Sequence, residues 1–172
     1  MRSGLRQLTR CGWLLMAALL AVTADTRAQN PVTQNEAVSF VVAAQAKLTL
    51  SVSTLTFPNA DPDTVPQIQA SEGPLTITAK GRAAPGDQII LSVQASDDFR
   101  SGMDVIAIST LTWTATGIGF VGGVMNKTTA QPVALWTNSG SFTGTQTYLF
   151  ANSWTYATGS YNVTLTYTLS AP

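Results

Sequence analysis

A strict alternation of apolar and polar residues over positions 161–170 constrains the fold of this chain more than any other feature. The apolar residues share one face of an extended strand: Tyr161, Val163, Leu165, Tyr167 and Leu169. The polar residues occupy the other face: Asn162, Thr164, Thr166, Thr168 and Ser170. Because the side chains of a strand point alternately to opposite sides, this pattern predicts an antiparallel strand with one face on a core and one in water.

The same chemistry recurs after residue 28, and no stretch there has a helical period. We expect strands within 38–42, 47–57, 75–80, 88–95, 105–116, 131–137, 144–154 and 159–172. The apolar alternation in 47–57 slips by one residue near Ser53 and Thr54, which indicates a bulge or a change of sheet. Seven to nine strands joined by Gly, Pro and Asp turns predict an all-β, immunoglobulin-like antiparallel β-sandwich, with a closed barrel as the alternative.

The first 28 residues have the pattern of a cleaved signal peptide. Arg2, Arg6 and Arg10 precede an apolar run at 11–21, which is shorter than a membrane-spanning helix requires. Small residues at 26–28 fit a cleavage site, those at 22–24 offer a second one, and an uncleaved membrane anchor is the alternative. We expect a signal peptide at 1–28, a flexible lead at 29–37 and one β-sandwich domain at 38–172. An exported chain would reach the periplasm, the cell surface or the extracellular space.

Composition excludes several kinds of function. Removing four of nine basic and one of nine acidic residues with the signal peptide leaves five and eight, a net charge of −3. Nucleic-acid binding needs clustered Lys and Arg, so no nucleic-acid partner is expected. The only cysteine, Cys11, leaves with the signal peptide, and the chain has no histidine. Imidazole-based catalysis and thiolate metal sites are therefore excluded in the mature chain, in which no membrane span is expected either.

The acidic residues offer two weaker signals for chemistry. Asp97 and Asp98 are adjacent and would point to opposite faces of a strand, so we expect a solvated turn and no enzyme. Two separated acids acting as a glycosidase pair are the alternative. Asn59, Asp61 and Asp63 could offer oxygens to calcium, but Asx turns explain this loop equally well. We therefore expect no catalytic residue, no cofactor and no metal, and we leave calcium binding in this loop open.

Three tryptophans remain after residue 28 and could bind a glycan. Aromatic rings on β-sandwiches can stack on sugar rings, whereas Trp113 and Trp154 are expected to pack in the core. Trp136 is the candidate for glycan stacking. A carbohydrate- or peptidoglycan-binding module is accordingly the alternative function.

The two ends of the chain resemble known surface proteins. The terminal segment 159–169, with Pro172, is similar to the closing motif of WxL surface domains, with Tyr167 at the position of the tryptophan. Residues 38–42, 50–52 and 55–57 resemble the start of spore-coat-U-type and chaperone–usher pilin subunits, as does the Gly-x-Tyr at 159–161. Those subunits usually carry a disulfide, which this chain lacks after residue 28. Both resemblances imply an immunoglobulin-like sandwich at a bacterial cell surface.

These observations predict a secreted, non-catalytic structural or adhesive module. In the pilus-like form of this hypothesis, residues 37–45 of one subunit add as a strand to another, with Val38, Phe40 and Val42 filling pockets. The alternative is that these residues form the first strand of their own sandwich. The expected partners are further copies of the chain, other surface proteins or polysaccharide.

Overall fold

A computed structural model of the chain describes residue 34 and residues 36–172. The expected signal peptide, 1–28, and most of the expected lead lie outside these residues. The chain divides into two units, 1–39 and 40–172, and every strand belongs to the second. Within the described residues, no helix is long and apolar enough to cross a membrane.

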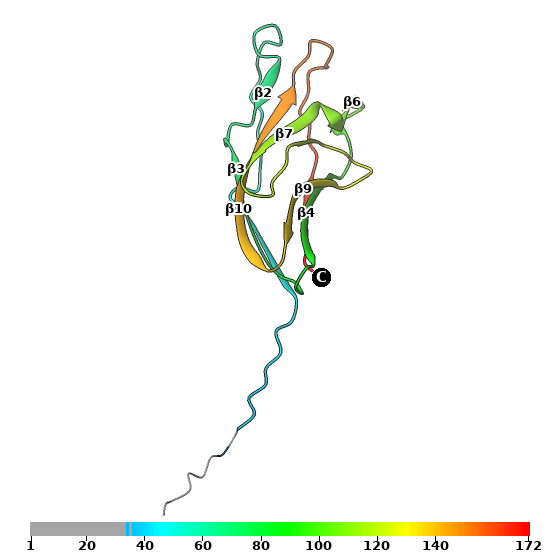
Figure 1. The fold of residues 1–172 in the computed structure, drawn as a ribbon. Helices are drawn as coiled ribbons and strands as arrows, with labels where there is room; N and C mark the ends of the chain where they lie inside the picture. Colours follow the sequence, from blue (N-terminus) through cyan, green and yellow to red (C-terminus); the bar gives the residue numbers. More distant parts are fainter. Residues whose placement is uncertain (1–33, 35) are drawn as a thin grey trace, which may run out of the picture. The chain divides into compact units, whose positions relative to one another are not determined.

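The second unit is all-β, as the sequence predicts (Figure 1). Its strands are β1 (Gln45–Leu50), β2 (Gln67–Gln69), β3 (Leu75–Arg82), β4 (Gln88–Ala95), β5 (Phe99–Ser101), β6 (Asp104–Ile106), β7 (Leu111–Thr116), β8 (Gly123–Val124), β9 (Gln131–Thr137), β10 (Gly140–Ala151) and β11 (Leu165–Ser170). A single 3-10 turn, η1 (Ile108–Thr110), is the one helical element in the described residues. Eleven strands exceed the expected seven to nine because β2, β5, β6 and β8 are pieces of two or three residues.

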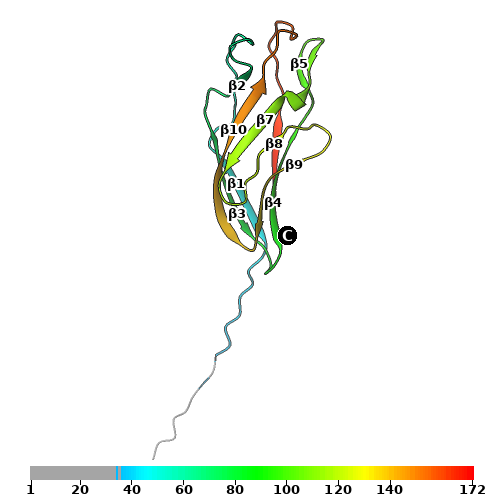
Figure 2. The ribbon, with the colours of Figure 1, turned by 45° about the horizontal axis from the view of Figure 1, so that its top comes forward.

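The strands form two facing sheets and a small hairpin, and all their pairings are antiparallel. The larger sheet has the order β1-β3-β10-β7-β8, with β2 also paired to β10. The smaller sheet has the order β11-β4-β9, and β5 pairs with β6. Figure 2 shows β4 and β9 in a layer separate from β1, β3, β7 and β10.

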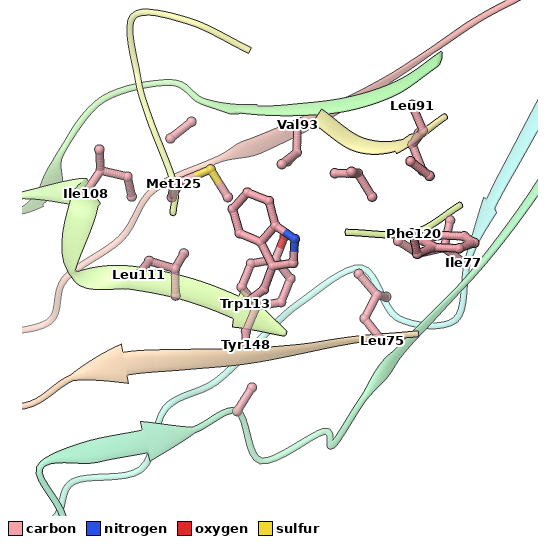
Figure 3. Close-up of a cluster of buried hydrophobic side chains, with 14 of the residues drawn as sticks. Leu75, Ile77, Leu91, Val93, Ile108, Leu111, Trp113, Phe120, Met125 and Tyr148 are labelled. Carbon is pink, nitrogen blue, oxygen red and sulfur yellow. The ribbon is translucent and has the colours of Figure 1, made fainter. Parts of the chain in front are cut away.

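The core lies between the two sheets because the central strands alternate buried and outward-facing residues. On β4, Ile89, Leu91 and Val93 are fully buried, and on β3 Ile77 and Ala79 are. In Figure 3, Trp113 and Tyr148 of the larger sheet extend toward Val93 of the smaller one. Burial of apolar side chains at about 1.5–3 kcal/mol each is the main force that holds the layers together.

The outer edge of β9 is covered by residues 117–121 of the same chain. Val121 N–H donates to the Val133 carbonyl at 2.9 Å, and Leu135 N–H donates to the Gly119 carbonyl at 3.1 Å. Gly119 has φ +83°, and a Cβ there would lie 2.6 Å from the Leu135 carbonyl oxygen. The glycine-rich loop at 117–123 therefore approaches β9 closely enough to hydrogen-bond to its outer edge.

Several strand boundaries differ from the sequence prediction. The expected strand 105–116 is divided by η1, the expected strand 159–172 is regular only over β11, and the start of the sandwich differs as well. The first strand begins at Gln45, so residues 38–44 belong to no strand. This strand also ends at Leu50, before the slip at Ser53 and Thr54. Beyond β1, Ser51 N–H donates to the Thr76 carbonyl and Ser51 Oγ accepts from Thr76 N–H. The serine side chain takes the place of a backbone partner, which explains why the regular ladder stops here.

Candidate functional site: the open edge between β1 and β11

Two neighbouring strands each leave one edge without a hydrogen-bonded partner in the described part of the chain. β1 pairs only with β3, and β11 pairs only with β4. These two strands end the two facing sheets on the same side of the sandwich, and β1 contacts β11. An exposed edge presents free N–H and C=O groups that can pair with another strand. We call β1, β11 and the extended residues 51–57 and 161–164 that continue them the open edge.

The open edge carries a double row of half-buried apolar side chains. Each residue packs against the core on one side and remains accessible on the other. The row along β1 and its continuation contains Leu48, Leu50, Val52, Leu55 and Phe57. The row along β11 and its continuation contains Tyr161, Val163, Leu165, Tyr167 and Leu169. The sequence predicts the apolar face of β11 correctly, but no fully buried residue occurs on this strand.

Tyr167 ties the open edge to the middle of the larger sheet. Its hydroxyl lies 2.6 Å from the Tyr148 hydroxyl and donates to Gln146 Oε1. Burial raises the pKa of Tyr167 to about 12 and raises the pKa of Tyr148 further, so both phenols are neutral at neutral pH. Gln146 is fully buried, and its Nε2 has no hydrogen-bond partner in the described residues.

The segment predicted to donate a strand is outside both sheets. Val38, Phe40 and Val42 are 86%, 84% and 61% exposed. Residues 40–44 extend away from the sandwich in Figures 1 and 2. The alternative from the sequence, that residues 38–42 are the first strand of their own sandwich, is wrong for this structure because no strand includes them.

The paired acids form an ion cluster beside the segment that precedes β11, where the backbone of Arg100 pairs with that of Asn162. Lys127 Nζ lies 2.6 Å from Asp98 Oδ2 and 3.1 Å from Asp97 Oδ1, and Arg100 Nε lies 2.7 Å from Asp97 Oδ2. Hydrogen bonds from Arg100, from the Asp98 backbone and from Lys127 lower the pKa of Asp97. Those from Lys127 and the Ile108 backbone lower the pKa of Asp98. Both carboxylates are ionised and paired, which does not suit a general acid at neutral pH.

The acid loop at 58–66 is held by an Asx turn. Asp61 Oδ1 accepts from Asp63 N–H at 2.9 Å, and the Asp61 carbonyl accepts from Thr64 N–H and Val65 N–H. No group of three acidic, histidine or cysteine side chains in the described residues is arranged to hold a metal ion. The Asx turn at Asp61 therefore accounts for the geometry of this loop.

The tryptophans are placed differently from the sequence expectation. Trp136 is only 5% exposed, its ring stacks on Phe142 at 4.4 Å, and its Nε1 donates to the Ile118 carbonyl. Trp136 is thus a core residue and cannot stack on a glycan in this structure. Trp113 is buried as expected, whereas Trp154, expected in the core, is 69% exposed. The neighbouring residues did differ: Trp136 follows the apolar run 133–135, whereas Trp154 lies between polar residues at 152, 153 and 155, and this difference was the missed signal.

No protein-family model and no curated protein matches this chain.

Proposed function

We propose that this protein is an exported, non-catalytic structural subunit whose copies join by strand addition. Residues 37–45 of one copy would pair with the open edge of the next, in an extracellular or envelope-attached fibre. The observation that carries the proposal is the double row of half-buried apolar side chains beside unpaired strand edges. An added strand would supply the missing hydrogen bonds and cover these side chains together.

Residues 37–45, the donor segment, have the apolar side chains that the open edge requires. Val38, Phe40 and Val42 alternate with Ser39 and Val41, so an extended strand presents three large apolar side chains on one face. Fully burying one such side chain contributes about 1.5–3 kcal/mol. Main-chain hydrogen bonds would add affinity that does not depend on the side chains.

The sequence around β1 favours a partner copy over the chain's own open edge. To reach its own β11, the donor segment would have to reverse direction just before β1 begins at Gln45. Residues 37–50 contain no Gly, Pro, Asn or Asp, the residues on which tight reversals depend. The segment is therefore suited to remain extended and to meet another molecule.

Matched aspartate substitutions on the two faces of the donor segment test the proposal. Phe40→Asp should abolish filaments seen by negative-stain microscopy and shift the protein to a monomer in size exclusion, because the incoming strand would bury a charge. Val41→Asp, at a residue on the other face that is at least as exposed, should still assemble. The proposal fails if both variants assemble like the unmodified protein, or if the unmodified protein remains a monomer.

A second variant separates failed assembly from failed folding. A chain with residues 36–45 repeated after Pro172 through a glycine-rich linker can form an antiparallel hairpin with its own β11. We expect a monomer that unfolds at higher denaturant concentration than the Phe40→Asp monomer. Equal midpoints would show that the open edge does not accept this segment.

A further inference from the structure

Trp154 lies at the end of the sandwich where β10 finishes, next to the loop at 58–66. Its indole remains largely in water although it is the largest side chain of its loop. Nε1 of this indole donates to Asp63 Oδ1 at 3.1 Å. The hydrogen bond fixes the ring between two loops and leaves its face available.

The loop that carries Trp154 is held firmly. Asn152 Nδ2 donates to the Ala60 carbonyl at 3.0 Å and to the Val65 carbonyl at 3.2 Å, and Asn152 N–H donates to the Pro66 carbonyl at 2.9 Å. Beneath the loops, Phe150 contacts the aromatic rings of Phe57 and Tyr156. A ring held in this way loses little conformational freedom when a ligand stacks on it.

We infer that Trp154 and Asp63 form a stacking platform for neutral polysaccharide. An exposed aromatic face beside hydrogen-bond acceptors matches a pyranose ring, which presents C–H groups on its faces and hydroxyl donors at its rim. Asp63 Oδ2 accepts no hydrogen bond from the described residues, so it is free to accept from a sugar hydroxyl. Carboxylates at Asp61 and Asp63, neither in an ion pair within the described residues, disfavour an acidic polysaccharide.

The platform residues Trp154 and Asp63 lie outside the open edge and the donor segment, although Phe57 of the open edge contacts Phe150 beneath their loops. The platform lies on loops of the β2 and β10 end, whereas the donor segment precedes Gln45, which pairs with Arg82 at the other end of β3. Assembly into a fibre would repeat the platform along the polymer and raise avidity without a new contact. Binding by the subunit itself needs no such assembly.

Binding to soluble neutral glucan and mannan, measured by isothermal titration and by retardation in polysaccharide gels, tests the inference. Trp154→Ala should weaken binding about tenfold through loss of ring stacking, whereas Trp154→Phe should keep most of it. Asp63→Ala should weaken binding because it releases the indole, and Asp63→Asn should retain more binding because its amide oxygen still accepts from Nε1.

The control is Ile118→Ala, which removes an even more exposed apolar side chain from another loop and should bind normally. The inference is overturned if the unmodified protein binds none of these polysaccharides or if Trp154→Ala binds as tightly as the unmodified protein. Preferential binding to polygalacturonate, an acidic polymer, would overturn it as well. Assembly scored in the same preparations reports on strand addition separately, so either proposal can fail alone.

Discussion

The two edge strands of the smaller sheet, β9 and β11, both pair with β4 but differ in what covers their outer edges. On the β9 edge, residues 117–121 supply backbone hydrogen bonds, and Val133, Ala134 and Trp136 are buried. On the β11 edge no segment of the described chain does this, and Leu165, Tyr167 and Leu169 stay half-buried. A sandwich can therefore complete one edge with its own loop while the opposite edge stays available for another strand.

Truncating one large side chain on each edge strand should give the largest difference in the free energy of unfolding between the two edges. Trp136→Ala should lower the free energy of unfolding by about 3–5 kcal/mol, because it leaves a cavity beside Phe142 under the covering loop. Leu169→Ala should lower it by about 1–2 kcal/mol, because this side chain is already partly in water. Denaturant unfolding of the unassembled protein measures both. Equal losses would show that the β11 edge is covered as well as the β9 edge.

High pH should lower the stability of the protein, in part through Tyr167 of the β11 edge. Tyr167 titrates near pKa 10 when unfolded and at about 12 when folded, so its contribution is complete below pH 10. Stability should fall as the pH rises from about 10 to 12, by as much as ~3 kcal/mol at the upper limit, because the unfolded chain loses its proton first. Tyr148, whose pKa is raised in the same direction, adds to this loss.

The control for the pH effect is Tyr167→Phe, in which the loss between pH 10 and 12 should shrink. Unfolding midpoints followed by circular dichroism at each pH give the comparison. An unchanged pH profile in this variant would assign the alkaline loss to other groups.

The sequence predicts the strands of both edges but not their covering. Alternation at 161–170 identifies the apolar face of β11, because the period of two is a local property of an extended chain. Whether that face lies under another strand depends on where distant segments run. The glycine-rich loop at 117–123 reaches β9, whereas residues 38–42, with an equally good strand pattern, join no sheet.

The tryptophans show the same limit of local patterns. Trp136 follows the apolar run 133–135 and Trp154 lies among polar residues, but the stacking of Trp136 on Phe142 and the hydrogen bond of Trp154 to Asp63 depend on where distant segments run. Tyr167 is likewise recognised as core-facing, but its hydrogen bond to Gln146 depends on a pairing across the two sheets. The face of a strand on which a residue lies is determined by the local sequence, whereas the contacts between the sheets depend on distant segments.

Paired substitutions in the Tyr167–Gln146 contact should give the smallest effects and the sharpest test of how β11 is held. Tyr167→Phe removes the donor to Gln146 Oε1 and leaves a fully buried amide without partners, which should cost about 1–3 kcal/mol. Gln146→Met should change stability by less than about 1 kcal/mol, because it removes an amide whose Nε2 is already unpaired. Tyr167 would still hydrogen-bond to Tyr148 in that variant. If Gln146→Met is instead as harmful as Tyr167→Phe, the amide and not the pair of tyrosine hydroxyls anchors the open edge to the larger sheet.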